Sequence, residues 1–141
     1  MLRKIKTEIK NLIYSNLSAD EIANGFAIGV FIGFLPLYGF QTLLSLFAAF
    51  LFKKVNKLAL IIATQLFLPP VIPFVVFLNY LIGSLILYKK IFFLKVTSLE
   101  DVITYIKPIF LGSIFVGLFF AFLSKYLLKF VIINIRRKNE K

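Results

Sequence analysis

The sequence contains no cysteine, no histidine and no tryptophan, and it has only six acidic residues among 141. It therefore lacks thiol nucleophiles, the most common general base and the usual zinc ligands. Four of the carboxylates, Asp20, Glu21, Glu100 and Asp101, fall at expected helix starts, where capping and the helix dipole account for them. We therefore expect no enzymatic activity, no bound cofactor and no metal site.

Hydrophobic residues are abundant instead, at 60% of the chain with 18 phenylalanines and a mean hydropathy of +0.94. No charged side chain falls within residues 22–52, 58–88 or 108–124, which are 31, 31 and 17 residues long. About 18 or more uncharged, mostly apolar residues are typical of a membrane-embedded helix. The sequence predicts an all-α integral membrane protein that forms a single domain over residues 1–141.

The charge that is present is mainly positive, with 17 basic against 6 acidic residues and a formal net charge of +11. Basic residues follow or precede each apolar stretch and do not alternate with aromatic residues on one platform. This distribution favours contact with anionic lipid headgroups over binding of nucleic acid. The expected headgroup contacts are Lys53, Lys54, Lys57, Lys89 and Lys90.

Residues 1–17 have the pattern of an amphipathic helix. Its apolar stripe is formed by Leu2, Ile5, Ile9, Leu12 and Ile13. Such a basic amphipathic helix is expected to lie in the membrane interface, or alternatively to pack on a partner. Ser18 followed by Glu21 is a capping-box pattern, which predicts that the next helix begins near Ala19 or Asp20.

The two long apolar stretches have an unusual length for membrane helices. A continuous helix over 22–52 would be about 46 Å long, whereas the hydrocarbon core is about 30 Å thick. Pro36 falls near the centre of this stretch, and 58–88 has three central prolines. These are Pro69, Pro70 and Pro73. Because proline ends or kinks helices, both stretches are predicted to be broken in the middle.

Two geometries are open for these broken segments. If each segment enters the membrane and returns as a re-entrant hairpin, the basic clusters around them stay on the cytoplasmic side, as the positive-inside tendency favours. The alternative is that each segment crosses once as a kinked, tilted span. The hairpin geometry is the preferred prediction.

The C-terminal segment 98–133 is predicted to contain a short interfacial helix, capped by Ser98 and Asp101, and then a transmembrane helix. The tail 134–141 is basic. A single final crossing would place this tail opposite the other basic clusters, against the same positive-inside tendency, so the sequence leaves its side open.

Glycines at positions 25, 29 and 33 form a small-xxx-small series on one helix face. Such a face lets two helix backbones approach closely. We therefore interpret Gly25, Gly29 and Gly33 as helix-packing residues; the alternative is a sliding surface between hairpins.

Polar residues flank both predicted breaks and have two interpretations. On the first interpretation, they satisfy backbone groups that the prolines free. Alternatively, the free N–H groups of the half-helix after each break attract an anionic phosphate or carboxylate group. On this second interpretation the ligand-binding residues at the hairpin tips are Pro36, Gly39, Gln41, Thr42, Gln65, Pro69 and Pro73.

Residues 25–42, with the sequence GFAIGVFIGFLPLYGFQT, resemble the opening signature of a bacterial membrane family known as domain of unknown function 2062. The resemblance continues to about Tyr88, although Leu68, Pro69 and Val71 stand where the family has Asn-Pro followed by Thr. Membership implies a multi-pass inner-membrane protein, and fusion of some members to glycosyltransferases implies envelope metabolism. The paired breaks are also similar, in architecture only, to the DedA family, whose members are associated with movement of polyprenyl-phosphate carriers.

These observations lead to one preferred function and one alternative. We expect a small inner-membrane protein that transports or flips an anionic lipid or solute in envelope metabolism. Its expected partners are membrane lipids and either further copies of itself or another membrane protein. The alternative is a non-transporting membrane scaffold that docks a partner enzyme.

Overall fold

The computed structural model describes residues 1–14, 18–67, 69–90 and 98–139, which form six α-helices and no β-strand. The helices are α1 (Leu2–Tyr14), α2 (Ala19–Phe34), α3 (Gln41–Leu51), α4 (Lys57–Gln65), α5 (Ile72–Tyr88) and α6 (Leu99–Asn139). The prediction of an all-α chain is confirmed. Residues 15–17 and 140–141 of the expected N-terminal helix and basic tail lie outside the described residues, as do the side chains of Ile9, Leu12 and Ile13.

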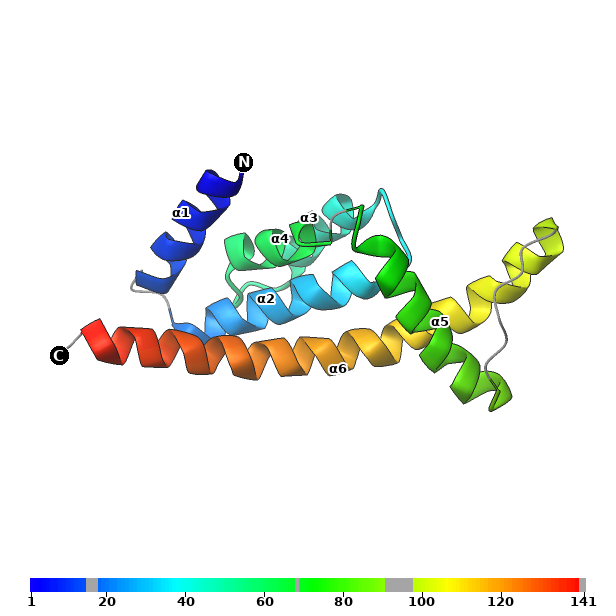
Figure 1. Cartoon of the computed structure of the whole chain (residues 1–141). Helices are drawn as coiled ribbons and strands as arrows, with labels where there is room; N and C mark the ends of the chain where they lie inside the picture. The colour runs from blue at the N-terminus through cyan, green and yellow to red at the C-terminus, as the bar shows by residue number, and fades with distance from the viewer. Residues whose placement is uncertain (15–17, 68, 91–97, 140–141) are drawn as a thin grey trace.

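Helix α6 is the axis on which the other helices are arranged (Figure 1). Its 41 residues are about 60 Å long. Helix α2 runs antiparallel to it, because Ile22 shares a buried cluster with Ile132 whereas Phe34 stacks on Phe120 at a ring-centroid distance of 5.1 Å. Helix α5 packs on the N-terminal half of α6, and α4 packs on α2.

Helix α6 is continuous through two boundaries that the sequence predicts. Pro108 lies inside the helix, so the expected interfacial helix and transmembrane helix are one element, and the tail is helical as far as Asn139. A proline removes one backbone hydrogen bond and normally kinks a helix. Here Pro108 is fully buried, and the backbone of α5 at Gly83 lies directly against its carbonyl group. Packing of α5 therefore supports the helix at the position where sequence alone predicts a boundary.

The start of α2 and the first break follow the prediction. The Ser18 hydroxyl accepts a hydrogen bond from the Asp20 N–H at 3.2 Å, so α2 begins at Ala19. The helix ends at Phe34, before Pro36, and α3 begins at Gln41. The turn between them contains Gly39 with a φ angle of +96°, a conformation that side chains with a Cβ atom disfavour.

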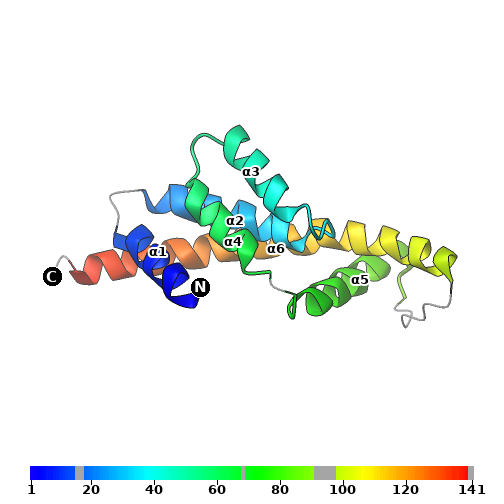
Figure 2. The ribbon, with the colours of Figure 1, turned by 90° about the horizontal axis from the view of Figure 1, so that it is seen from above.

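The first apolar stretch folds back on itself. The N–H of Asn56, just after the stretch, donates to the carbonyl of Glu21, just before it, at 3.0 Å. The Asn56 side chain also accepts from the Ala59 N–H at 2.8 Å and so caps α4. Helix α3 splays away from α2 in the view from above (Figure 2). The stretch 22–52 is therefore a helical hairpin with an open side.

The second apolar stretch does not fold back. Ala59 in α4 shares a cluster with Ile132 of α6, whereas Gly83 in α5 lies against Pro108. These two α6 positions are 24 residues apart, or about 36 Å along the helix. Helices α4 and α5 do not lie side by side in either view (Figures 1 and 2). The structure thus differs from the expected second hairpin.

The second break also lies earlier than its central proline. Helix α4 ends at Gln65, and Pro73 is within the first turn of α5. Proline is accepted there because the N–H groups of the first turn have no intrahelical partner. Pro69 lies in the break, whereas Pro73 belongs to the helix that follows it.

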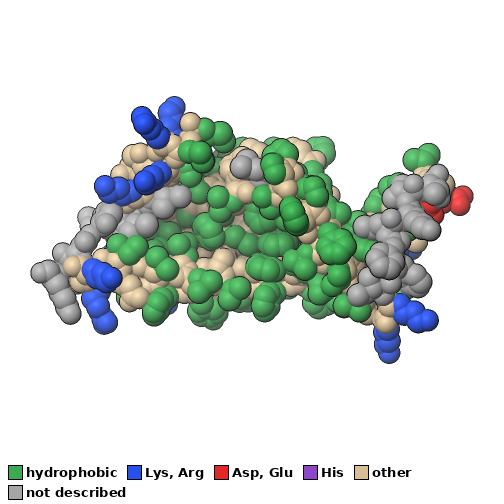
Figure 3. Space-filling view, viewed as in Figure 1, with side chains coloured by type: hydrophobic (Ala, Val, Ile, Leu, Met, Phe, Trp, Pro, Cys, Tyr) green, Lys and Arg blue, Asp and Glu red, His purple; other side chains and the backbone are tan. Residues whose placement is uncertain are grey.

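Apolar side chains cover much of the surface (Figure 3). In the described part of the chain, α6 is the one helix long and apolar enough to cross a membrane, and α3 and α5 are shorter apolar helices. Phenylalanines on three helices are largely exposed, including Phe50, Phe74 and Phe130. Lys and Arg side chains gather toward the two ends of the molecule in this view, with hydrophobic side chains between them.

Candidate functional site

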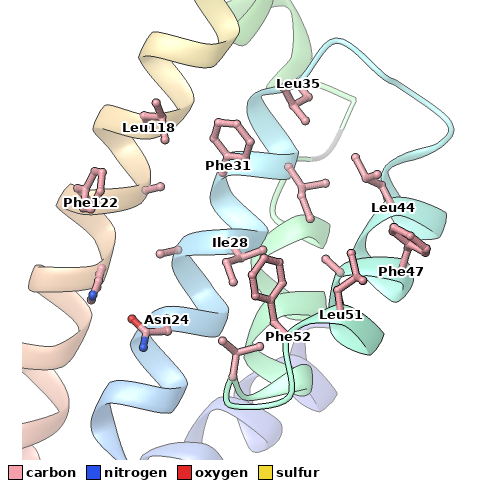
Figure 4. Close-up of a pocket in the computed structure, with 16 residues that line it drawn as sticks. Asn24, Ile28, Phe31, Leu35, Leu44, Phe47, Leu51, Phe52, Leu118 and Phe122 are labelled. Atoms are coloured by element: carbon pink, nitrogen blue, oxygen red, sulfur yellow. The ribbon is translucent and has the colours of Figure 1, made fainter.

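A groove with a volume of about 700 Å³ lies between α2, α3 and α6. Figure 4 shows Phe122 of α6 and Phe47 of α3 on opposite sides of it, with Phe31 of α2 between them. The groove exists because α3 leaves the break at an angle to α2 and does not pack along it. Its volume falls within the range of about 300–1,000 Å³ found for small-molecule sites.

Each of the three helices presents one face to this groove. The lining residues recur at helical spacing in α2 and its C-cap (Asn24, Ala27, Ile28, Phe31, Ile32, Leu35), in α3 (Leu44, Phe47, Ala48, Leu51) and in α6 (Leu118, Ala121, Phe122, Lys125). Residues three and four apart lie on the same helix face. Phe52 and Val55, in the loop after α3, complete the lining. Apart from Asn24 and Lys125, every lining side chain is apolar.

The two polar residues of the groove lie at the same end, near the start of α2. Lys125 is half-buried, and its ammonium group is 6.0 Å from the ring centroid of Tyr126. Its neighbour Lys129 pairs with Asp20 at 2.7 Å. No acidic side chain among the described residues pairs with Lys125, and Asn24 makes no side-chain hydrogen bond with any of them. This end therefore carries a positive charge that pairs with no carboxylate of the described residues.

The glycine series of α2 faces away from the groove and toward α4. A Cβ atom at Gly25 or Gly29 would overlap the backbone carbonyl of Asn56 or Leu60. At Gly33 it would overlap the ring of Phe67. The partner of this face is thus an internal helix, and α2 uses one face for close packing and another to line the groove.

Polar side chains at the first break donate hydrogen bonds to the backbone carbonyl groups at the C-terminal end of α2. The Gln41 side-chain amide donates to the carbonyl groups of Gly33 at 3.1 Å and Leu35 at 3.5 Å. The Asn79 amide of α5 donates to the Phe34 carbonyl at 2.8 Å. Carbonyl groups at a helix end have no intrahelical partner and are costly to bury unpaired. These hydrogen bonds match the interpretation in which side chains satisfy freed backbone groups.

The two breaks are connected by a further polar contact. The Gln65 amide at the end of α4 donates to the Thr42 hydroxyl at 3.3 Å. Pro36 is half-buried, whereas Gly39, Pro69 and Pro73 are exposed. No side chain caps the first N–H groups of α3 or α5. Gln41, Thr42 and Gln65 are thus brought together at the breaks, but their side chains bond protein groups.

The predicted headgroup lysines are all exposed, and they divide between two ends of the molecule. Lys53, Lys54 and Lys57 lie beside the start of α2, through the Asn56–Glu21 hydrogen bond. Lys89 and Lys90 follow α5, at the N-terminal end of α6. No group of three or more His, Cys, Asp or Glu side chains that could hold a metal ion occurs in the described ranges.

Sequence reasoning missed the groove, Asn24 and Lys125. The one available signal was the spacing of 24, 28, 31 and 35, which marks a second face of α2 beside the glycine face. Asn56, the cap that closes the first hairpin, was also missed as a structural residue, although asparagine before an apolar helix is a common cap.

Comparison with known proteins places the chain in a family. Its residues 2–141 match the model of a family described as an uncharacterized protein conserved in bacteria (DUF2062). No curated protein and no solved structure matches it. The resemblance predicted from residues 25–88 is therefore confirmed, and it extends over almost the whole sequence. The chain belongs to the bacterial DUF2062 family.

Proposed function

We propose that this protein is a multi-pass protein of the inner membrane that binds an anionic lipid or solute and moves it, without catalysing a reaction. The observation that carries the proposal is an apolar body with one strongly basic end, from which a lateral groove extends. This basic end consists of Lys53, Lys54, Lys57, Lys125, Lys129, Arg136, Arg137 and Lys138.

The exposed apolar surface supports a membrane location. On α6 the large exposed hydrophobic side chains extend from Leu99 to Ile133, and no charged residue lies between Lys107 and Lys125. This uncharged part is about 25 Å of helix, close to a hydrocarbon core of about 30 Å, and it leaves both lysines near the two membrane surfaces. Contiguous apolar surface of this extent is rare on soluble monomers, whereas lipid covers it without cost.

The helix arrangement supports a topology in which all the basic-end residues are cytoplasmic. The hairpin of α2 and α3 enters from the basic end and returns to it. Helices α4 and α5 together cross to the other end, and α6 crosses back. The tail after Ile133 then lies on the same side as Lys53 and Lys54, so the positive-inside tendency is satisfied. The opposite end carries Lys89, Lys90 and Lys107 together with Glu100 and Asp101.

The basic end supports an anionic substrate. Each Lys or Arg near a membrane surface contributes about 1 kcal/mol of attraction to anionic lipid. Eight such residues around one end of the molecule would concentrate anionic headgroups beside the groove. Transport further requires that the bound molecule changes leaflet, which the experiments below measure directly.

The topology can be tested with single cysteines, because the protein has none of its own. Asn56→Cys, Ser98→Cys and Asn139→Cys variants are labelled with a membrane-impermeant thiol reagent in intact cells and in inverted vesicles. We expect positions 56 and 139 to react from the cytoplasmic side and position 98 from the opposite side. Labelling of positions 56 and 98 from the same side would contradict the crossing by α4 and α5.

Transport is tested with the purified protein in vesicles that contain a fluorescent phosphatidylglycerol. Protein-dependent loss of leaflet asymmetry is the expected result, and a fluorescent phosphatidylcholine is the control. If neither these lipids nor anionic solutes redistribute, the scaffold function replaces the transport function.

A further inference from the structure

We propose that the groove between α2, α3 and α6 holds one hydrocarbon chain of an anionic lipid, whose headgroup lies at Lys125 and Asn24. This inference rests on the proposed membrane location, and it names the class of ligand and the residues that select it. It does not require that the lipid crosses the membrane.

The dimensions of the groove fit one chain of one leaflet. Along α2 it extends from Asn24 to Leu35, eleven residues or about 16 Å. That length is about half of the hydrocarbon thickness of about 30 Å. Its start is level with the Asp20–Lys129 ion pair at the basic end, and its far end is at the first break. A chain that enters from the cytoplasmic leaflet would therefore end where α2 ends.

The lining is suited to a flexible chain and to little else. Phe31, Phe47 and Phe122 surround the groove from three helices (Figure 4). No polar side chain lines it between Asn24 and Leu35, so a polar solute would lose its hydration there without compensation. The occupant must be apolar over the length of the groove and polar only at the end near the start of α2.

The positive charge at this end of the groove favours a lipid with an anionic headgroup. Lys125 has no carboxylate partner among the described residues, in contrast to Lys129, and it is half-buried beside the apolar groove. A phosphate group placed there would neutralise it, and the Asn24 amide offers a hydrogen-bond donor to the same group. Lys53 and Lys54 adjoin the lining residues Phe52 and Val55, so they add positive charge at this opening.

The headgroup contact must also carry most of the selectivity. A lipid chain gains little from moving out of the bilayer into an apolar groove, because lipid tails are as apolar as the side chains. Lipids with the same chains but different headgroups therefore differ in affinity through their contacts with Lys125 and Asn24.

The experiment uses the full-length protein in nanodiscs that contain phosphatidylglycerol with a photoreactive diazirine in one chain. After illumination, the cross-linked residues are mapped by mass spectrometry. We expect cross-links concentrated on the groove faces of α2, α3 and α6, and several-fold fewer with the phosphatidylcholine analogue. Equal labelling by both lipids, or labelling spread over exposed phenylalanines such as Phe74 and Phe130, would overturn the proposal.

Two substitutions, each with a control variant, separate the role of the Lys125 charge from the role of the space for the lipid's hydrocarbon chain. Lys125→Gln should reduce cross-linking in the groove about fivefold, the effect of one interfacial charge. Lys90→Gln removes an equal charge at the opposite end and should leave cross-linking unchanged. Leu118→Trp should fill the groove and reduce labelling, whereas Ile133→Trp, at a similarly exposed α6 position outside the groove, should not.

Unchanged labelling in both Lys125→Gln and Leu118→Trp would refute the site. Cross-links between two protein chains through the groove faces would instead show that a second copy fills it, and would also refute the lipid assignment. Because this readout measures occupancy, a protein that labels as expected but moves no lipid in vesicles would remove the transport function and leave the binding site in place.

Discussion

The crossing of α5 and α6 makes a sharp prediction, because two glycines bring the helix backbones into contact. A Cβ atom at Gly83 would overlap the carbonyl of Pro108, and one at Gly112 would overlap the carbonyl of Asn79. In both cases the obstructing atoms are backbone and cannot rotate away. Gly83→Ala or Gly112→Ala would therefore force the two helices apart by a distance on the order of 1 Å, since non-bonded carbon atoms approach to about 3.5 Å.

That separation would weaken contacts formed on both sides of the crossing. The Asn79 amide would be pulled from the Phe34 carbonyl, now at 2.8 Å, and the Tyr80 ring from Tyr105, now at 5.5 Å between centroids. Overpacking of this kind costs about 1–3 kcal/mol. For a chain of this size, such a loss lowers the midpoint of thermal unfolding by several degrees, at about 2–4 °C per kcal/mol.

The assay is the temperature at which half of the detergent-purified protein loses its monodisperse peak in size-exclusion chromatography. Gly117→Ala is the matched control, because its Cβ atom would meet the ring of Phe31 at 3.0 Å, and that side chain can adjust. We expect the control to change the midpoint by less than about 2 °C. If Gly83→Ala and Gly112→Ala behaved like Gly117→Ala, the close approach of α5 and α6 would be wrong.

Three further substitutions test other parts of the structure in the same assay. Gln41→Leu should destabilise the protein by about 1–3 kcal/mol, because it leaves the carbonyl end of α2 without its amide donor; an unchanged midpoint would argue against this hydrogen bond. Gly39→Ala should cost about 1 kcal/mol through its φ angle of +96° alone, since no atom lies within 4 Å of the added Cβ, and Gly39→Asn should cost less. Asp20→Asn should change stability by less than about 1 kcal/mol, because its ion pair with Lys129 is largely exposed; a larger loss would indicate a buried pair.

Local features of the chain were predictable because they depend on neighbouring residues. Ser18 and Pro36 mark the start and end of α2, and the glycine series marks its packing face. The course of the second apolar stretch was not predictable in this way. Whether it returns or continues depends on where it meets α6, and both contacts are distant in the sequence: Ala59 packs with Ile132, 73 residues later, and Gly83 with Pro108, 25 residues later.

The groove was harder to predict than the helices that form it. Its polar end combines Asn24 with Lys125, about a hundred residues later, and its lining is indistinguishable in composition from any lipid-facing surface. Sequence reasoning gave two interpretations of the polar residues at the breaks, because prolines are visible there. The side chains at the first break match the interpretation in which they bond the backbone that the prolines free.

Because α6 is one unbroken helix, it behaves as a rod that is longer than the bilayer is thick. Bilayers of different thickness would change its tilt, since tilting is how a long apolar helix accommodates a thinner core. The same helix lines the groove through Phe122 and contacts the backbone of α5 at Gly112. In the proposed membrane location, lipid composition would thereby set the width of the groove and the angle of α5 together, so that the membrane would act as an effector of the protein.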